Sequence, residues 1–284
     1  VVHSGFPGVV TIAEESTAWP GVTRDSSSGE KALGFTFKWD MGWMNDTLTY
    51  FQHEHGKRQE HQDELTFASA YRKQECFFLP LSHDEVVHEK RSLLNRMPGD
   101  EQQRFANLRV LYGYQWMYAG KQLFFMGGEL GQRNEWDHDG EIDWDCLNVA
   151  GLPRDLQRWV SDLNRLYREE PAFWAGDFDE HGFFWVDCSD HAACVLSFVR
   201  QTPDGSRQAL GLLNLMSSAH DAYRVGLPQA GVWREVLNSD SEHYGGNNDG
   251  NGGGVYSQDV PWQNQPWSAD FLLPSLSCSV FLHG

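Results

Sequence analysis

Three stretches within one short region decide the fold: CFFLPL at 76–81, PGDEQQRFANLRVLYGYQW at 98–116 and QLFFMGG at 122–128. The first and third are short apolar runs, which are typical of buried strands. The middle stretch begins with a turn and a candidate helix N-cap, Asp100, and then carries apolar residues at helical spacing. Strand, helix and strand in this order predict a βαβ unit with parallel strands.

The same alternation extends to both sides of this unit. Further strands are predicted at 9–13 and 33–40, and further helices at 43–54, 59–73 and from Pro153 to about residue 168. The region up to about residue 174 therefore contains four strand–helix units. Four units can build a doubly wound sheet, or they can equally form half of an eight-stranded barrel, which would leave strand edges unpaired.

Beyond about residue 176 the pattern changes to short alternating runs separated by turn residues. Strands are predicted at 182–186, 193–199, 209–215, 233–237 and 279–282. This spacing is typical of an antiparallel β-sandwich of roughly 100 residues. The predicted organisation is an α/β part in residues 1–174, followed by an all-β sandwich domain in residues 175–284.

The composition excludes some classes of molecule as binding partners of this chain. The 284 residues carry 22 Lys+Arg against 40 Asp+Glu, a formal net charge of −18, and such a chain repels nucleic-acid phosphates. No apolar run reaches the length of a membrane span, so neither nucleic acid nor membrane is an expected partner. The five cysteines are scattered and odd in number, which favours reduced thiols in the cytoplasm. The 12 Trp favour a ligand with flat apolar faces, such as a sugar ring.

Carboxylates follow three of the predicted strands. The first strand ends in Glu14-Glu15, the third leads to Asp84 and the fourth to Glu129. Catalytic groups of βα barrels lie at the carboxyl ends of strands, so a pair of these could act on a glycosidic bond. The same residues can equally be helix caps or solvated loop charges. Glu14 and Glu15 are adjacent and point to opposite sides, and spacing alone does not choose between them.

No motif for a metal or cofactor is found. His83, His88, His138 and Asp139 could be imagined as metal ligands, but their spacing matches no known site. There is no phosphate-cradling glycine loop, and no Ser or Cys lies in a nucleophile-elbow context. We therefore expect no metal and no cofactor.

Two motifs carry a resemblance to a known family. Residues 11–17 read TIAEEST and residues 81–88 read LSHDEVVH, supported by KWDMGWMNDTL at 38–48 and RMPGD at 96–100. In these segments the chain resembles the α-amylase superfamily and, within it, the bacterial glycogen branching enzymes (1,4-α-glucan branching enzymes). The resemblance covers essentially the whole chain. It implies the C-terminal half of a (β/α)8 barrel followed by a C-terminal antiparallel β-sandwich domain.

The resemblance also implies an activity. Members of that family are retaining transglycosylases, which cut an α-1,4-glucan chain, hold it covalently and transfer it to a 6-hydroxyl. By position in the motifs, Glu14 corresponds to the general acid/base, Asp84 to the transition-state stabiliser and His83 to a residue that hydrogen-bonds sugar hydroxyls. Trp136 is a candidate stacking residue, and equally a candidate loop anchor. The implied partner is an α-1,4-glucan such as glycogen or an amylose-like chain.

The resemblance is incomplete at one essential position. The family's nucleophile, an Asp after the fourth barrel strand, has no counterpart in this sequence. We therefore expect a missing N-terminal half of the barrel to supply it, and we expect the 284 residues alone to be inactive. Two alternatives stay open: an inactive glucan-binding or structural fragment, and an α-glucan hydrolase of the same superfamily. Glu89 and Gly128 also depart from the family pattern, which usually has Gly and Asn there.

Overall fold

A four-stranded parallel sheet begins the chain in the computed structural model, which describes residues 2–25 and 32–284. Its strands lie side by side in chain order: β1 (Ile12–Ala13), β2 (Phe37–Trp39), β3 (Phe77–Leu81) and β4 (Lys121–Phe124). The predicted parallel alternation is confirmed, although β1 and β2 are shorter than predicted. Among the described residues β1 and β4 each have one strand neighbour, so both outer edges of this sheet are open.

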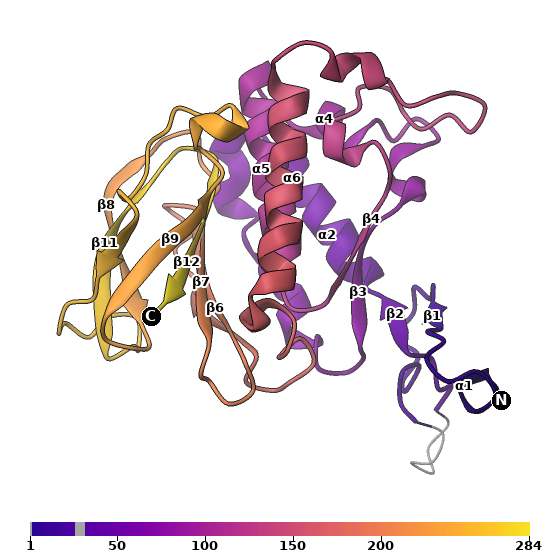
Figure 1. The fold of residues 1–284 in the computed structure, drawn as a ribbon, viewed down its shortest axis with the longest axis horizontal. Helices are drawn as coiled ribbons and strands as arrows, with labels where there is room; N and C mark the ends of the chain where they lie inside the picture. Colours follow the sequence, from indigo (N-terminus) through magenta and orange to yellow (C-terminus); the bar gives the residue numbers. More distant parts are fainter. Residues whose placement is uncertain (1, 26–31) are drawn as a thin grey trace.

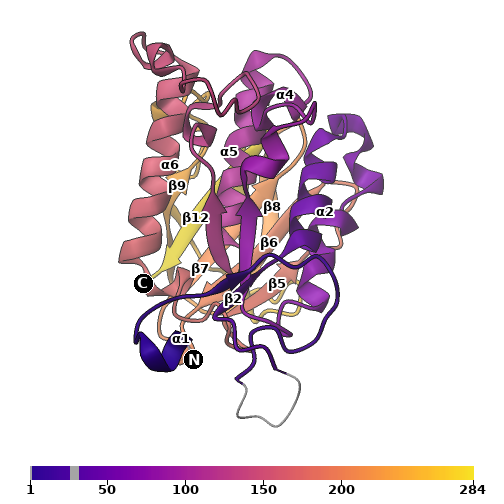
Figure 2. The same ribbon diagram turned by 90° about the vertical axis from the view of Figure 1, so that its right-hand side faces the viewer.

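Three longer helices accompany this sheet: α2 (Met41–Gln52), α5 (Glu101–Met117) and α6 (Leu152–Glu169). The predicted N-cap of α5 is confirmed, because the Asp100 carboxylate accepts a hydrogen bond from the Gln103 backbone N at 2.9 Å. The Gln103 side chain accepts in return from the Asp100 backbone N at 3.0 Å, which completes a capping box. Helices α5 and α6 lie between the parallel sheet and the β-rich part (Figure 1). Figure 2 shows the molecule from the side of β2, with α5 and α6 behind the parallel strands.

The single helix predicted at 59–73 is wrong. The chain instead forms three short pieces, η2 (His55–Glu60), α3 (Asp63–Thr66) and η3 (Phe67–Ala70). Tertiary hydrogen bonds outweigh helical propensity here. The buried Arg58 guanidinium donates to the Leu215 carbonyl at 2.8 Å, and Gln62 Nε2 donates to the Cys188 carbonyl at 3.0 Å. The breaks in the helix let both side chains reach the β-rich part.

The β-rich part contains two antiparallel sheets. A six-stranded sheet has the order β10-β9-β12-β7-β6-β5, and a two-stranded sheet pairs β11 with β8. The predicted strands are confirmed, whereas β8, β10 and β11 were not predicted. The strands are β5 (Phe183–Asp187), β6 (Val195–Gln201), β7 (Gln208–Asn214), β8 (His220–Leu227), β9 (Val232–Asn238), β10 (Gly254–Tyr256), β11 (Trp267–Leu273) and β12 (Ser277–His283).

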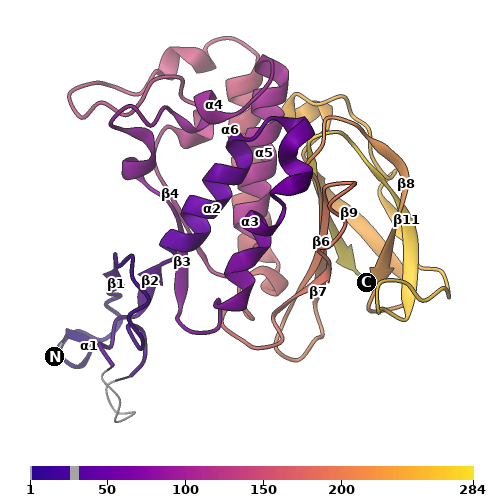
Figure 3. The same cartoon turned by 180° about the vertical axis from the view of Figure 1, so that it is seen from behind.

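The central strands of the six-stranded sheet are buried on both faces. In β7, Ala209 and Leu213 pack into the cluster that contains the helices, whereas Leu210 and Leu212 pack into a second cluster with the two-stranded sheet. Because successive side chains of a strand point to opposite faces, this alternation buries all seven residues of β7. The sandwich therefore shares one of its two cores with α5 and α6 (Figure 3).

Helix α5 lies directly against β12 at a glycine. A Cβ atom at Gly113 would lie 2.4 Å from Cys278 Sγ, which no real side chain tolerates without a shift. Trp159 of α6 packs at the same place, and its indole Nε1 donates to the Arg109 carbonyl at 2.9 Å. The absent side chain thus permits the close approach of helix and strand.

The remaining elements are short connections. They are α1 (Val2–Gly5), η4 (His83–Val86), α4 (Leu93–Arg96), η5 (Gly128–Leu130), η6 (Trp144–Leu147), η7 (Pro171–Phe173) and η8 (Glu242–Tyr244). Among the residues that the structure describes, no helix combines the length and apolar character needed to cross a membrane.

Candidate active site

The first component of the site is the turn that follows β3. Ser82 caps η4: its backbone N donates to Glu85 Oε2 at 2.6 Å, and its hydroxyl donates to the same oxygen at 2.7 Å. Glu85 is buried and its Oε2 accepts both hydrogen bonds of this cap, so it is a structural carboxylate. The cap leaves the neighbouring His83 and Asp84 side chains accessible, at 43% and 44% exposure, with His83 Nε2 3.1 Å from Asp84 Oδ1.

The second component is the loop that follows β4, which is tied to the first. The Glu135 carboxylate accepts hydrogen bonds from the backbone N atoms of Glu89 at 3.0 Å and Arg91 at 2.6 Å. The Trp136 backbone N donates to the Val86 carbonyl at 2.9 Å. Glu89 has a φ of 65°, in the left-handed region that favours glycine, which explains why the resembling family usually has Gly there. Together these bonds hold Trp136 beside η4.

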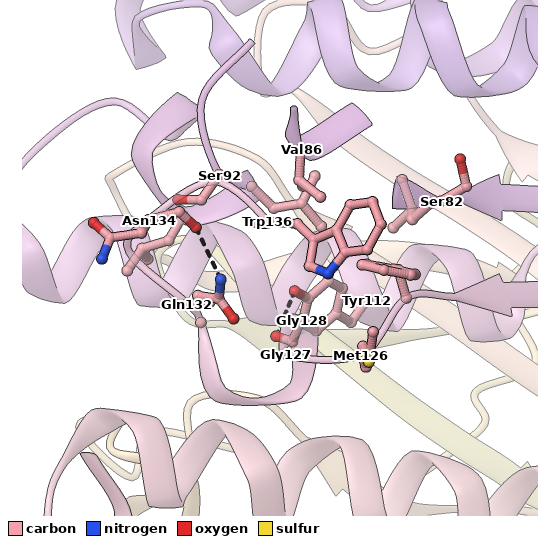
Figure 4. A pocket seen from close by; sticks show the side chains of 15 residues that line it. Ser82, Val86, Ser92, Tyr112, Met126, Gly127, Gly128, Gln132, Asn134 and Trp136 are labelled. Carbon is pink, nitrogen blue, oxygen red and sulfur yellow. Dashed lines mark hydrogen bonds between the residues drawn. The ribbon is translucent and has the colours of Figure 1, made fainter. Parts of the chain in front are cut away.

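Aromatic rings line this junction. The ring of His83 lies 5.6 Å from that of Trp136 and 5.9 Å from that of Phe125, and Phe125 and Trp136 are 5.2 Å apart edge to face. Figure 4 shows the Trp136 indole between Val86 and Ser82, lining a pocket at the ends of β3 and β4. Sequence reasoning missed Phe125, because a Phe at a strand end is ordinary core until its ring contacts are seen.

The two glutamates after β1 differ in their surroundings. Glu15 Oε2 forms an ion pair with Lys38 Nζ at 2.6 Å, and the Glu15 carboxylate also accepts from the Thr17 backbone N at 2.7 Å. The hydrogen bond from Lys38 is the main cause that holds the pKa of Glu15 below its ordinary value. Glu14 is exposed and has no hydrogen bond or ion pair with another residue in the described ranges. Only Glu14 is therefore free to meet a ligand.

The structure brings three of the four predicted site residues together. Asp84, His83 and Trp136 lie at the junction of the loops after β3 and β4. Glu14 lies elsewhere: Ala13 pairs with Lys38, Lys38 pairs with Phe77 at the start of β3, and Asp84 follows the end of β3. Glu14 is thus level with the start of β3, and no contact between Glu14 and Asp84 occurs in the described part of the chain.

A further carboxylate, Asp40, lies at the end of β2 and was given no role from the sequence. Its Oδ1 accepts from the Trp43 backbone N at 2.9 Å and from the Tyr71 hydroxyl at 2.8 Å, whereas Oδ2 has no partner. The residue is 2% exposed, and burial raises its pKa from 3.8 to about 6. The sequence shows only an Asp at the end of a predicted strand, before a predicted helix. It does not show that one oxygen of this Asp is buried without a partner.

Replacing Asp40 by asparagine is expected to stabilise the protein at neutral pH. The folded state holds the proton of Asp40 more tightly than the unfolded chain, so stability falls as pH rises from about 4 through about 6. The asparagine side chain keeps the accepting oxygen and removes the buried charge, for a gain of up to about 3 kcal/mol at pH 7. Urea unfolding at pH 4 and pH 7 measures it.

The matched control is Asp221→Asn, on the exposed side of β8. It is expected to leave the free energy of unfolding unchanged at both pH values. If the Asp40→Asn variant gained the same free energy of unfolding at both pH values, the buried charge of Asp40 would not be the cause of the gain.

Comparison with known proteins agrees with this architecture. Residues 185–284 match the family described as the alpha amylase C-terminal all-beta domain. Over 283 residues the chain is 52% identical to the 1,4-alpha-glucan branching enzyme GlgB of Thiobacillus denitrificans, an alignment that covers 99% of this chain and 37% of the relative. Along essentially its whole length the chain is a homologue of 1,4-alpha-glucan branching enzymes. The enzyme of the same name from Aquifex aeolicus is 48% identical over 282 residues, covering 99% of this chain and 44% of the relative.

The chain spans about two fifths of the length of those relatives. Its fold also matches solved α-amylases. The α-amylase of Geobacillus thermoleovorans, solved in complex with acarbose, superposes with a TM-score of 0.64 at 12% identity, covering 100% of this chain and 55% of that one. An Anoxybacillus α-amylase superposes with a TM-score of 0.62 at 15% identity, covering 99% of this chain and 53% of that one. The expected fold, the C-terminal half of a (β/α)8 barrel followed by an antiparallel β-sandwich, is confirmed.

Proposed function

We propose that this chain is the C-terminal portion of a cytoplasmic 1,4-α-glucan branching enzyme of glycogen synthesis. Residues 1–174 form half of the catalytic barrel in this proposal, and residues 175–284 form the C-terminal domain. The observation that carries it is the 52% identity to a branching enzyme along essentially the whole chain. The junction of Asp84, His83 and Trp136, at the carboxyl ends of β3 and β4, supports it because barrel enzymes carry their catalytic groups there.

Each site residue has a role in this reaction. Glu14 acts as the general acid/base in this proposal, which requires it to meet Asp84 at one sugar although it lies level with the start of β3 in the described chain. Its freedom from hydrogen bonds within the described residues supports this choice over Glu15, which Lys38 holds ionised. Asp84 stabilises the positive charge that develops at the anomeric carbon. His83 binds sugar hydroxyls, and Trp136 offers a half-buried aromatic face to a sugar ring.

The reaction proceeds in two displacements. In the first, a carboxylate nucleophile bonds to the anomeric carbon, the α-1,4 bond breaks, and Glu14 gives its proton to the departing 4-oxygen. In the second, Glu14 takes the proton of an acceptor 6-hydroxyl, whose oxygen displaces the nucleophile. One α-1,4 bond is exchanged for one α-1,6 bond, and the configuration of the anomeric carbon is retained.

The nucleophile comes from an N-terminal half of the barrel in this proposal. The open edges of β1 and β4 support it, because unpaired edges of a parallel sheet are the places where further barrel strands would bind. The 284 residues alone are then inactive, because they contain the acid/base and the stabiliser without the group that holds the cut chain.

A chimera tests the proposal. Residues 1–284 replace the corresponding segment of the Thiobacillus denitrificans relative, and the product is incubated with amylose beside the 284-residue chain alone. We expect new α-1,6 linkages, measured by chain-length analysis after enzymatic debranching, from the chimera and none from the chain alone. A folded chimera that makes no branches would contradict the proposal, and release of reducing ends without branches would favour an α-glucan hydrolase.

A further inference from the structure

Three side chains with metal-binding atoms meet where α2 ends. His53 follows α2 directly, His61 follows η2, and Glu64 lies in the first turn of α3. His53 Nε2 is 3.2 Å from Glu64 Oε2, and His61 Nδ1 is 3.0 Å from Glu64 Oε1. One ligand atom from each of the three lies within 4.8 Å of the others, and all three residues are half-buried.

These distances fit a small divalent cation. Zinc binds imidazole nitrogen and carboxylate oxygen at about 2.0–2.2 Å in a tetrahedron, which places neighbouring ligand atoms about 3.4 Å apart. The two N–O distances are close to that value. The imidazole rings stack with centroids 3.7 Å apart, and each ring is hydrogen-bonded to one oxygen of the Glu64 carboxylate, so a bound ion would replace both hydrogen bonds. Side-chain rotation is all that is needed to direct both lone pairs at one ion, because none of the three is locked in the core.

The charge around the cluster favours a cation. Burial raises the pKa of the Asp46 carboxyl in α2, and the negative charge of Glu64 raises it further, so the two carboxylates lie near each other. The Arg58 guanidinium forms no ion pair with Glu64 or Asp46 among the described residues, because its N–H groups donate to the carbonyls of Phe51 and Leu215. Asp46 and Glu64 therefore supply negative potential that no lysine or arginine ion pair neutralises within the described residues.

A second group of such side chains provides a contrast. Asp137, His138 and Asp139 are consecutive and fully exposed, with His138 and Asp139 at 76% and 84% exposure. All three lie next to one another on one exposed loop, so no second element fixes their side chains in a geometry around an ion. The cluster at the end of α2 differs because its three ligands come from three elements that the fold holds in place.

We propose that His53, His61 and Glu64 bind a divalent transition metal of the zinc class, with Asp46 or water as the fourth ligand. The site is structural. It closes the segment 53–64, from which Arg58 and Gln62 reach the carbonyls of the β-rich part. A bound ion would restrict the motion of this segment and thereby stabilise the contact between the barrel half and the sandwich. The inference is independent of the proposed branching activity.

Zinc titration of the 284-residue chain tests the site. We expect one equivalent of Zn²⁺ to bind by isothermal titration calorimetry, and Co²⁺ to give the visible absorption of a tetrahedral complex. His53→Gln and His61→Gln are each expected to weaken Zn²⁺ binding by roughly tenfold or more, since each removes one of three protein ligands. The matched control is His243→Gln, an exposed histidine in η8, which should bind Zn²⁺ like the parent chain.

A second measurement guards against misfolded variants. One equivalent of Zn²⁺ is expected to raise the melting temperature of the parent and of His243→Gln, and to leave that of His53→Gln unchanged. Circular dichroism establishes that each variant is folded before titration. Absence of stoichiometric binding to the folded parent, or undiminished binding by the His53 and His61 variants, would overturn the site.

Discussion

Replacing Asp84 by asparagine in the chimera is expected to lower the branching rate by a factor on the order of 10²–10³. Asp84 lies at the end of β3 with 44% of its side chain exposed, and Ser82 and Glu85 fix the turn that presents it. Asparagine keeps the shape and removes the negative charge that faces the developing oxocarbenium ion. Initial rates of α-1,6 linkage formation on amylose measure the effect. Glu14→Gln is expected to cause a loss of similar size, because the amide cannot donate a proton.

The control for both variants is Glu89→Gln, an exposed carboxylate on the same loop that takes no part in the proposed reaction. It should branch like the parent chimera. Near-normal branching by Asp84→Asn or by Glu14→Gln would remove that residue from its proposed role.

Truncating Arg200 to alanine is expected to cost about 3–5 kcal/mol of the free energy of unfolding. Its guanidinium is fully buried and donates to the carbonyls of Met117 and Tyr118 at 2.9 Å each and to that of Phe173 at 2.8 Å. It also pairs with the buried carboxylate of Asp177. Alanine leaves these acceptors without a donor, and Lys121 as the remaining charged partner of Asp177. Urea unfolding of the 284-residue chain measures the loss.

Two variants sharpen this result. Lys73→Ala removes an ion pair whose two side chains are mostly exposed, and is expected to cost less than about 1 kcal/mol. Arg200→Lys keeps the charge but loses the planar fork that reaches several carbonyls at once, so its cost should be intermediate. An Arg200→Ala variant as stable as the parent would show that water replaces these hydrogen bonds.

The sequence predicts those elements whose signals are local. The capping pair Asp100 and Gln103, followed by apolar residues at helical spacing, gives α5 within one residue at its start. The TIAEEST and LSHDEVVH motifs identify both the family and the turn that carries Asp84. Short apolar runs between turn residues give the central strands of the sandwich, because these strands bury both faces.

The features that sequence reasoning missed depend on distant contacts. The segment 59–73 breaks into short turns because Arg58 and Gln62 bond to carbonyls far along the chain. Strand β8 reads HDAYRVGL, and its polar half faces solvent, so its pairing with β11 leaves little pattern. The choice between Glu14 and Glu15 depends on Lys38, which lies on a different strand. None of these partners can be inferred from spacing.

The shared core between the sandwich and the helices limits how this region can be recombined. The face of β12 that carries Cys278, Val280 and Leu282 is covered by helices of the barrel half, with Gly113 setting the contact distance. A β-rich segment cut out at the boundary of its sequence family would expose that apolar face to water. Exchange of this segment between related enzymes thus requires the surfaces of α5 and α6 to be exchanged with it. The part that can be exchanged as a whole is therefore larger than the sandwich alone.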